Sequence, residues 1–215
     1  LARKKNIKSA VLTFDPHPDF ILKKRENHGY ITPITSKTNY IEKLGIDYLI
    51  IIEFDFEISQ LEPSEFEKKF LFNFQIDTLI AGFDFRYGRM GKGNVDRLSL
   101  LNKFSVIKFE EVKYHNQKMG SELVRKYLEE GELEHVTNIL GRFYNISGKV
   151  VPGNKVGRTL GFKTANINLE ENYHFLRKGV YGVFVYINQN RYLGVCNIGN
   201  NPSVNYTEKP RLEVH

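Results

Sequence analysis

A glycine-rich segment from Gly148 to Ile167 carries the residue types that phosphate and metal chemistry require. Three glycines at four-residue spacing precede a Thr-Ala-Asn triplet: Gly153, Gly157 and Gly161. Glycines permit the backbone conformations and the close approach that a polyphosphate needs, and the amides of such a turn can form a nest for anions. Thr164 and Asn166 then place two oxygens on the same face of a predicted strand, where they could hold Mg²⁺ against a nucleotide.

The same segment has two other interpretations. A P-loop requires four residues between its glycines and a lysine directly after the second one. Here three residues separate Gly157 from Gly161, and Phe162 precedes Lys163, so a P-loop is excluded. The other interpretation is a β-hairpin with glycine turns, in which the threonine and the asparagine satisfy local backbone groups. The segment alone leaves that alternative open.

Motifs in the second half of the chain, in their order and spacing, resemble the riboflavin kinase module of the prokaryotic bifunctional riboflavin kinase/FAD synthetase family. They read GVYG from Gly179, YLGVCNIGNNPS from Tyr192 and LEVH from Leu212. The resemblance implies transfer of the γ-phosphoryl group of ATP to the terminal ribityl hydroxyl of riboflavin, which gives FMN. Such a reaction needs a phosphate cradle, a divalent cation and a group that orients or deprotonates the hydroxyl.

For this reaction the resemblance implies Glu213 as the catalytic base and Thr164 with Asn166 as Mg²⁺ ligands. Strand alternation turns Glu213 away from its two apolar neighbours, either into a cavity or towards solvent. The implied phosphate-binding residues are Gly153, Lys155, Gly157, Gly161 and Thr164. The implied flavin-binding residues are Asn197, Asn201 and Arg211. Lys163 stands where the family has proline and adds a mobile cation next to the expected phosphate site.

Two motifs in the first half resemble signatures of the family's adenylyltransferase module, and a third resembles its junction with the kinase. They read TFDPHP from Thr13, IAGFDFRYG from Ile80 and LGR from Leu140. The resemblance implies attack of the FMN phosphate on the α-phosphate of ATP, a reaction carried by positioning and charge stabilisation. The implied flavin-binding residues are His17, Asp84, Phe85 and Arg86, and the implied ATP-binding residues are Ser121 and Arg125.

Structural interpretations remain open in this half as well. His17 could serve a rigid turn by satisfying a backbone group, and the segment from Gly82 to Gly93 could be a mobile surface loop. Glu122 stands where the family has threonine. If its carboxylate lies about 4 Å from a phosphate charge, repulsion costs on the order of 4 kcal/mol at an effective dielectric of about 20. If it turns outward, it is an early-helix acid that the helix dipole favours.

The chain starts at Leu1 without methionine and stops at His215 after a strand-like segment, so we expect it to be clipped at both ends. The HxGH motif of the family does not occur in this sequence. The resemblance implies that it lies before Leu1, and that further barrel strands and a terminal helix follow His215.

The composition is that of an ordinary soluble protein. The 215 residues are 41% hydrophobic and 26% charged, and no apolar run approaches the roughly 20 residues of a membrane span. The single cysteine, Cys196, excludes an intrachain disulfide and a cysteine-ligated metal site, and its strand-like surroundings predict a small buried apolar residue. The net charge of +6 suits ATP and flavin phosphates as well as nucleic acid. We therefore expect a cytoplasmic protein that does not bind a membrane. The resemblance implies that its ligands are ATP, flavins and Mg²⁺ rather than nucleic acid, and the sequence indicates no oligomeric state.

Hydrophobic periodicity predicts the elements that position these residues, in two domains that meet near Leu140. In residues 1–140, short apolar runs alternate with helical patterns, which is typical of an α/β domain with a mainly parallel sheet. Its predicted strands are Ser9–Phe14, Tyr48–Ile52, Thr78–Ala81 and Val106–Phe109. The predicted helices are Thr35–Leu44, Pro63–Phe74, Asn94–Lys103, Ser121–Glu130 and Leu133–Leu140. Gly45 is the predicted stop of the first helix, and Asn94 is the predicted cap of the third. In residues 141–215, aromatic and β-branched residues alternate, as in Val183–Ile187, which predicts an antiparallel β-barrel.

The resemblance identifies the first domain as a Rossmann-like FMN adenylyltransferase and the second as a riboflavin kinase barrel that is incomplete at its C-terminus. The first hypothesis is therefore a bifunctional transferase of flavin cofactor biosynthesis. Glu122 and Lys163 leave open a divergent paralogue with one surviving activity. A non-catalytic flavin- or nucleotide-binding regulator remains an alternative, because activity depends on the site rather than on the fold. The basic pI leaves an unrelated nucleic-acid-binding barrel as the last alternative.

Overall fold

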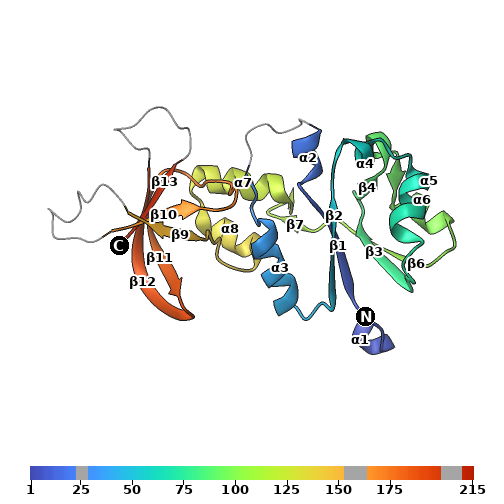
Figure 1. The fold of residues 1–215 in the computed structure, drawn as a ribbon, viewed down its shortest axis with the longest axis horizontal. Helices are drawn as coiled ribbons and strands as arrows, with labels where there is room; N and C mark the ends of the chain where they lie inside the picture. Colours follow the sequence, from blue (N-terminus) through green and yellow to red (C-terminus); the bar gives the residue numbers. More distant parts are fainter. Residues whose placement is uncertain (23–28, 153–163, 200–209) are drawn as a thin grey trace. The chain divides into compact units, whose positions relative to one another are not determined.

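The computed structural model describes residues 1–22, 29–152, 164–199 and 210–215 (Figure 1). The chain divides into two compact units. The first comprises Leu1–Asn27 and Ile34–Lys118, and the second comprises His28–Pro33 and Met119–His215. The domain boundary that the sequence places near Leu140 stays a prediction.

The first unit is built on two pairs of parallel strands. β1 (Ala10–Asp15) pairs with β2 (Tyr48–Glu53), and β3 (Thr78–Gly82) pairs with β6 (Ser105–Phe109). The sequence predicts all four strands, with each end within one residue of its observed position, and the parallel α/β class is confirmed. The antiparallel pairs are β4 (Arg86–Tyr87) with β5 (Gly93–Asn94), and β7 (Lys113–Tyr114) with β8 (Gln117–Lys118).

Short helices precede and connect the strands of the first unit. They are α1 (Ala2–Lys5), α2 (Pro18–Ile21), α3 (Ile34–Lys43), α4 (Phe56–Gln60), α5 (Pro63–Phe66), the 3₁₀ turn η2 (Arg89–Gly91) and α6 (Val95–Leu100). Gly45 follows α3 with a φ of +71°, as the predicted glycine stop requires. Asn94 caps α6 as predicted, because its Oδ1 accepts a hydrogen bond from the amide of Arg97 at 2.8 Å. The helix ends at Leu100, before the predicted end at Lys103.

The helix predicted over Pro63–Phe74 has a different form. α5 continues directly into a π-helical turn, η1 (Glu67–Leu71), where the helical segment ends. Glu67 is only 2% exposed, and its Oε1 accepts hydrogen bonds from Tyr87 Oη and Arg97 Nε, each at 2.6 Å. These contacts from outside the helix hold the backbone where the wider turn begins, a constraint that the apolar periodicity does not contain.

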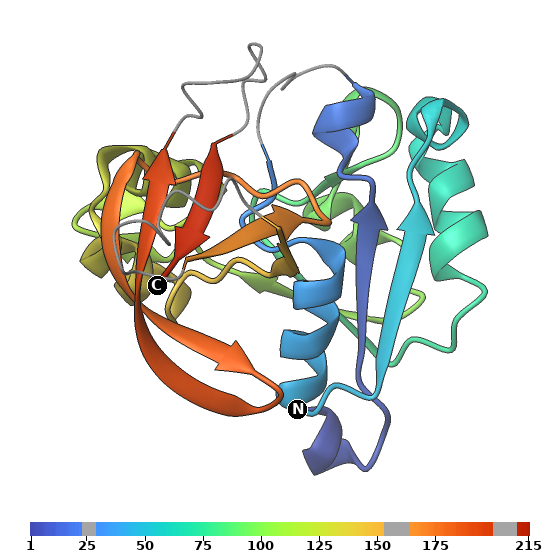
Figure 2. The same cartoon turned by 60° about the vertical axis from the view of Figure 1, so that its left-hand side comes forward.

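The second unit contains a five-stranded antiparallel sheet in the order β11-β12-β13-β10-β9 (Figure 2). Its strands are β9 (Gly148–Val151), β10 (Ala165–Leu169), β11 (Gly179–Ile187), β12 (Asn190–Gly199) and β13 (Arg211–Val214). β11 and β12 form a long curved hairpin, whose turn residues Asn188 and Gln189 have φ angles of +47° and +70°, as a two-residue I′ turn requires. The antiparallel class is confirmed, and within the described residues the sheet is not closed into a barrel.

One face of this sheet packs against two helices. α7 (Ser121–Glu130) and α8 (Leu133–Leu140) have the predicted bounds, and Gly131 between them adopts a left-handed φ of +78°. The buried residues of this core are Val124, Leu128, Val136, Leu176, Cys196, Ile198 and Leu212. Cys196 is a buried core residue as predicted, and burial raises the pKa of its thiol.

Candidate functional site

A row of polar residues crosses three neighbouring strands of the second unit. Glu213 of β13 is directly opposite Asn166 of β10 on one side and directly opposite Asn197 of β12 on the other. Directly opposed residues of antiparallel strands point to the same face of a sheet. The register therefore brings three of the predicted kinase residues together on one face.

The opposite face of the same strands belongs to the core. The neighbours of the polar row along each strand pack with the helices: Ile167, Cys196, Ile198, Leu212 and Val214. Because successive side chains alternate between the two faces, Glu213 and the two asparagines lie on the face that α7 and α8 do not cover. This assigns the polar row to one side of the sheet.

Asn166 is the most buried member of the row, with 6% of its surface exposed. Its Oδ1 atom is buried and accepts no hydrogen bond from the residues that the structure describes. A buried amide oxygen without a partner costs roughly 1–3 kcal/mol. Mg²⁺ prefers oxygen ligands of this kind, so the donor at Asn166 fits the predicted metal. Thr164 directly precedes β10 and is exposed, and its predicted role as the second ligand stays a prediction.

Arg211 adds a cation to the polar row. It lies two residues before Glu213 on β13, and its Nε is 3.4 Å from Glu213 Oε1. The side chains of Arg211 and Glu213 are 28% and 34% exposed, so the pair is shielded in part but open to a ligand. A half-exposed carboxylate held by a guanidinium can accept a proton from a hydroxyl that approaches this face.

The remaining residues predicted for the kinase site lie outside the described residues. They are Gly153, Lys155, Gly157, Gly161 and Asn201, and Lys163, which stands where the family has proline, lies there too. Among the described residues, no three His, Cys, Asp or Glu side chains form a group that could hold a metal ion. The predicted Mg²⁺ ligands are a threonine and an asparagine, which are outside that class of cluster.

His17 follows the carboxyl end of β1, as the sequence predicts for a ligand-binding residue of a parallel sheet. Its Nδ1 accepts a hydrogen bond from the amide of Asp19 at 3.2 Å and caps α2. The local role in a rigid turn is therefore present. The imidazole is still half exposed, at 51% of its side chain.

The three consecutive residues predicted for the flavin loop point to different environments. Phe85 packs with the core of the first unit and stacks on Tyr87 with ring centroids 5.7 Å apart. Asp84 and Arg86 are exposed. Asp84 accepts a hydrogen bond from the ammonium group of Lys118, which lowers the pKa of the Asp84 carboxyl. Phe85 thus anchors the loop, while its two charged neighbours face solvent.

The predicted ATP-binding residues Ser121 and Arg125 lie on α7, in the second compact unit. Ser121 is the first residue of the helix, and Arg125 follows four residues later, so both side chains lie on the same side of α7. Glu122 is exposed in the first turn, where the helix dipole favours an acid.

Sequence reasoning missed Lys37, a half-buried cation of the first unit. Its Nζ donates a hydrogen bond to Thr13 Oγ1 at 3.0 Å. A lone lysine within a helical pattern is typical of a solvated helix face, so the sequence contained no signal for its burial. Its contact with a strand depends on how α3 packs against β1.

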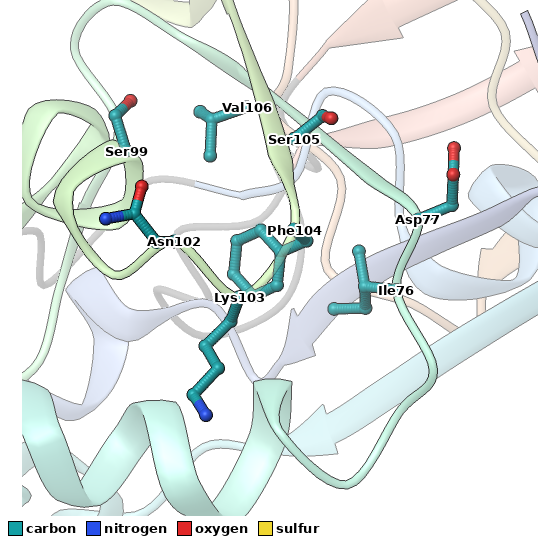
Figure 3. A pocket seen from close by; sticks show the side chains of 8 residues that line it. All are labelled: Ile76, Asp77, Ser99, Asn102, Lys103, Phe104, Ser105 and Val106. Atoms are coloured by element: carbon teal, nitrogen blue, oxygen red, sulfur yellow. The ribbon is translucent and has the colours of Figure 1, made fainter.

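A pocket of 770 Å³ opens elsewhere on the first unit, between residues that include Asp77, Lys103 and Ser105 (Figure 3). Asp77 precedes β3 and Ser105 begins β6, so the pocket lies at the amino ends of these parallel strands. The predicted flavin loop leaves from the opposite, carboxyl end of β3. None of the described site residues predicted from the sequence lines this pocket.

Two family models match the chain in succession. Residues 1–123 match the model described as FAD synthetase, and residues 140–215 match the model described as riboflavin kinase.

In the part of the chain that the structure describes, no helix has the length and apolar character to cross a membrane.

Curated relatives of this chain have names that combine the two activities. The bifunctional riboflavin kinase/FMN adenylyltransferase of Listeria monocytogenes is 35% identical over 100% of this chain and 69% of its own length. The protein of that name in Bacillus subtilis is 36% identical over 100% of this chain and 70% of its own length. The protein of that name in Escherichia coli K12 is 30% identical over 99% of this chain and 69% of its own length.

A solved structure has the same fold. The crystal structure of a macrolide-efflux protein from Streptococcus pneumoniae gives a TM-score of 0.87 at 26% identity, over 100% of this chain and 70% of that chain. The family models, the relatives and the two observed architectures all agree with the motifs in the sequence. The chain therefore belongs to the bifunctional riboflavin kinase/FMN adenylyltransferase family, and its function is the biosynthesis of flavin cofactors.

Proposed function

We propose that the protein carries out two successive ATP-dependent reactions: phosphorylation of riboflavin to FMN, and adenylylation of FMN to FAD. The polar row on the kinase sheet is the observation that carries the first reaction. Its acid, its two amides and the neighbouring guanidinium are the kinds of group that a phosphoryl transfer to a hydroxyl requires.

In the kinase reaction, Glu213 accepts the proton of the terminal ribityl hydroxyl. The hydroxyl oxygen forms a bond to the γ-phosphorus of ATP while the bond to the β–γ bridging oxygen breaks, and ADP leaves. Arg211 holds the carboxylate of Glu213 in place, because its Nε lies 3.4 Å from Oε1. Asn197 is exposed beside Glu213 and contributes an amide for the polar groups of the flavin.

Mg²⁺ is the proposed cofactor of this site. When bound with ATP, it neutralises phosphate charge. Asn166 would hold it through Oδ1, with Thr164 as the second oxygen donor. The buried Oδ1, which has no described hydrogen bond, supports this role for Asn166.

In the adenylyltransferase reaction, a phosphate oxygen of FMN attacks the α-phosphorus of ATP and pyrophosphate leaves. We assign flavin binding to His17, Asp84, Phe85 and Arg86. The half-exposed imidazole and the exposed charges of the loop support contact with a polar ligand, and Phe85 supports the loop from the core. Ser121 and Arg125 remain the proposed ATP-binding residues.

The proposed ligands are ATP and flavins rather than nucleic acid, and the proposed compartment is the cytoplasm, because both reactions consume ATP. The test is a chromatographic assay of the complete gene product with ATP and Mg²⁺, supplied with riboflavin in one reaction and FMN in the other. We expect FMN from the first reaction and FAD from the second. FMN formation in the first reaction without FAD formation in the second would indicate a paralogue that has only kinase activity. Flavin binding without either product would favour a regulator.

A further inference from the structure

Lys37 reaches the carboxyl end of β1 from the neighbouring helix. It is the fourth residue of α3, which lies beside β1 (Figure 2). Its Nζ donates a hydrogen bond to Thr13 Oγ1 at 3.0 Å, and Asp15, two residues later, ends the strand. Ligands of open parallel sheets bind at the carboxyl ends of the strands. Lys37 therefore places a positive charge at the edge where such a ligand is expected.

The end of β1 has one apolar face and one polar face. Phe14 packs against Phe54 and Phe66, with ring centroids 5.3 Å and 6.2 Å away. Thr13 and Asp15 alternate with Phe14 and lie on the other face, which Lys37 contacts. A hydroxyl, a carboxylate and an ammonium group thus share the polar face.

The environment of Lys37 disfavours an ammonium group that has no further anion. The side chain is half buried, and burial lowers the pKa of the Lys37 ammonium, while the charge of Asp15 opposes this effect. An ammonium group has three N–H donors, and the described hydrogen bond gives one of them to a neutral hydroxyl. A phosphate oxygen would accept a second donor and compensate the partly desolvated charge.

We propose that Lys37 is a further phosphate-binding residue of the adenylyltransferase site and contacts a phosphate oxygen of ATP or of FMN during adenylyl transfer. This rests on the proposed adenylyltransferase function. The residue takes part in no covalent step. It stabilises negative charge while the FMN oxygen bonds to the α-phosphorus and the bond to pyrophosphate breaks.

The test compares Lys37→Met with Lys37→Arg in the complete gene product. The methionine keeps an unbranched stem without the charge, and the arginine keeps the charge. Lys43→Met is the matched control, because Lys43 is an exposed residue of the same helix. FMN formation from riboflavin in the same samples reports whether the rest of the protein is intact.

Loss of one charge-assisted hydrogen bond predicts a fall in kcat/KM for FAD formation of roughly 10- to 100-fold in Lys37→Met. We expect partial recovery in Lys37→Arg and no change in Lys43→Met or in FMN formation. A higher KM for ATP alone would assign the contact to ATP, and a higher KM for FMN alone would assign it to FMN. FAD formation within twofold of the wild type in Lys37→Met would overturn the proposal.

A second measurement distinguishes failure of the Lys37 proposal from failure of the proposed adenylyltransferase function. Calorimetric titration with pyrophosphate measures anion binding without turnover, and Lys37→Met should weaken it by a similar factor. If the wild type forms no FAD, the proposed adenylyl transfer fails, and the titration still decides the role of Lys37. If Lys37→Met unfolds, a folded Lys37→Arg variant that neither binds pyrophosphate nor forms FAD would contradict the proposal.

Discussion

Asn166 and Glu213 face each other directly across β10 and β13, on the sheet face that the helices do not cover. The two residues are 47 positions apart in the sequence, and the antiparallel register alone brings them together. A buried oxygen donor thereby lies next to a half-exposed carboxylate. In the proposed kinase site, this pairing would place the metal ion beside the base.

Asn166→Leu should impair the use of Mg-ATP in FMN formation without lowering the stability of the fold. Removal of the buried amide oxygen, which has no described hydrogen-bond partner, should leave the free energy of unfolding unchanged or raise it by up to about 2 kcal/mol when Mg²⁺ and ATP are absent. The KM for Mg-ATP in FMN formation should rise roughly tenfold or more, because an oxygen ligand is lost. Urea unfolding and Mg²⁺ titration of FMN formation provide the two measurements. Asn168→Leu, an exposed change on the same strand, is the control. Destabilisation with a normal Mg²⁺ response would identify Asn166 as a structural residue.

The hydrogen-bond network of buried Glu67 and Tyr87 with the exposed Arg97 should stabilise the first unit. Burial and the hydrogen bond to Glu67 raise the pKa of the Tyr87 hydroxyl well above its usual range, so that it stays protonated and donates. Tyr87→Phe should lower the free energy of unfolding by roughly 1–3 kcal/mol, because a buried carboxylate loses a donor. Arg97→Leu should also lower the free energy of unfolding, because the buried carboxylate of Glu67 loses its counter-ion. Urea unfolding checks both predictions, with the exposed Tyr186→Phe as the control. If Tyr87→Phe and Arg97→Leu were as stable as the control Tyr186→Phe, the network would contribute nothing to the stability of the first unit.

Cys196 should be unreactive in the folded protein. Burial raises the pKa of its thiol, so the thiolate fraction at neutral pH is lower than for an exposed cysteine. A chromogenic thiol reagent should label it only as the second unit unfolds in urea. Labelling should therefore follow the loss of structure seen by circular dichroism. Rapid labelling without denaturant would contradict the assignment of Cys196 to the core.

The sequence predicts most of the elements because periodic apolar residues and end signals are local. The four long strands of the first unit and the bounds of α7 and α8 follow from such patterns. The π-turn at Glu67 could not be predicted, because its partners Tyr87 and Arg97 lie far along the chain.

The sequence names candidate residues for the site, and these assignments stay predictions, but it does not contain the geometry in which the described ones lie. Alternation around Glu213 correctly separates it from Leu212, which enters the core. The sequence has no signal for the register that brings Asn166 and Asn197 to either side of Glu213, because strand pairing depends on the whole sheet. The sequence also has no signal for the burial of Lys37, because that burial depends on the packing of α3 against β1.

Glu213 is the proposed base of the kinase reaction, and the proposed adenylyltransferase reaction does not use it. The most direct measurement compares Glu213→Gln with the wild type of the complete gene product, following FMN formation from riboflavin and FAD formation from FMN in the same preparation. Loss of a general base predicts a fall in FMN formation of roughly 100- to 10,000-fold, with ATP binding and FAD formation close to normal. Glu134→Gln, an exposed change on α8, should alter neither reaction. Near-normal FMN formation in Glu213→Gln would contradict the account.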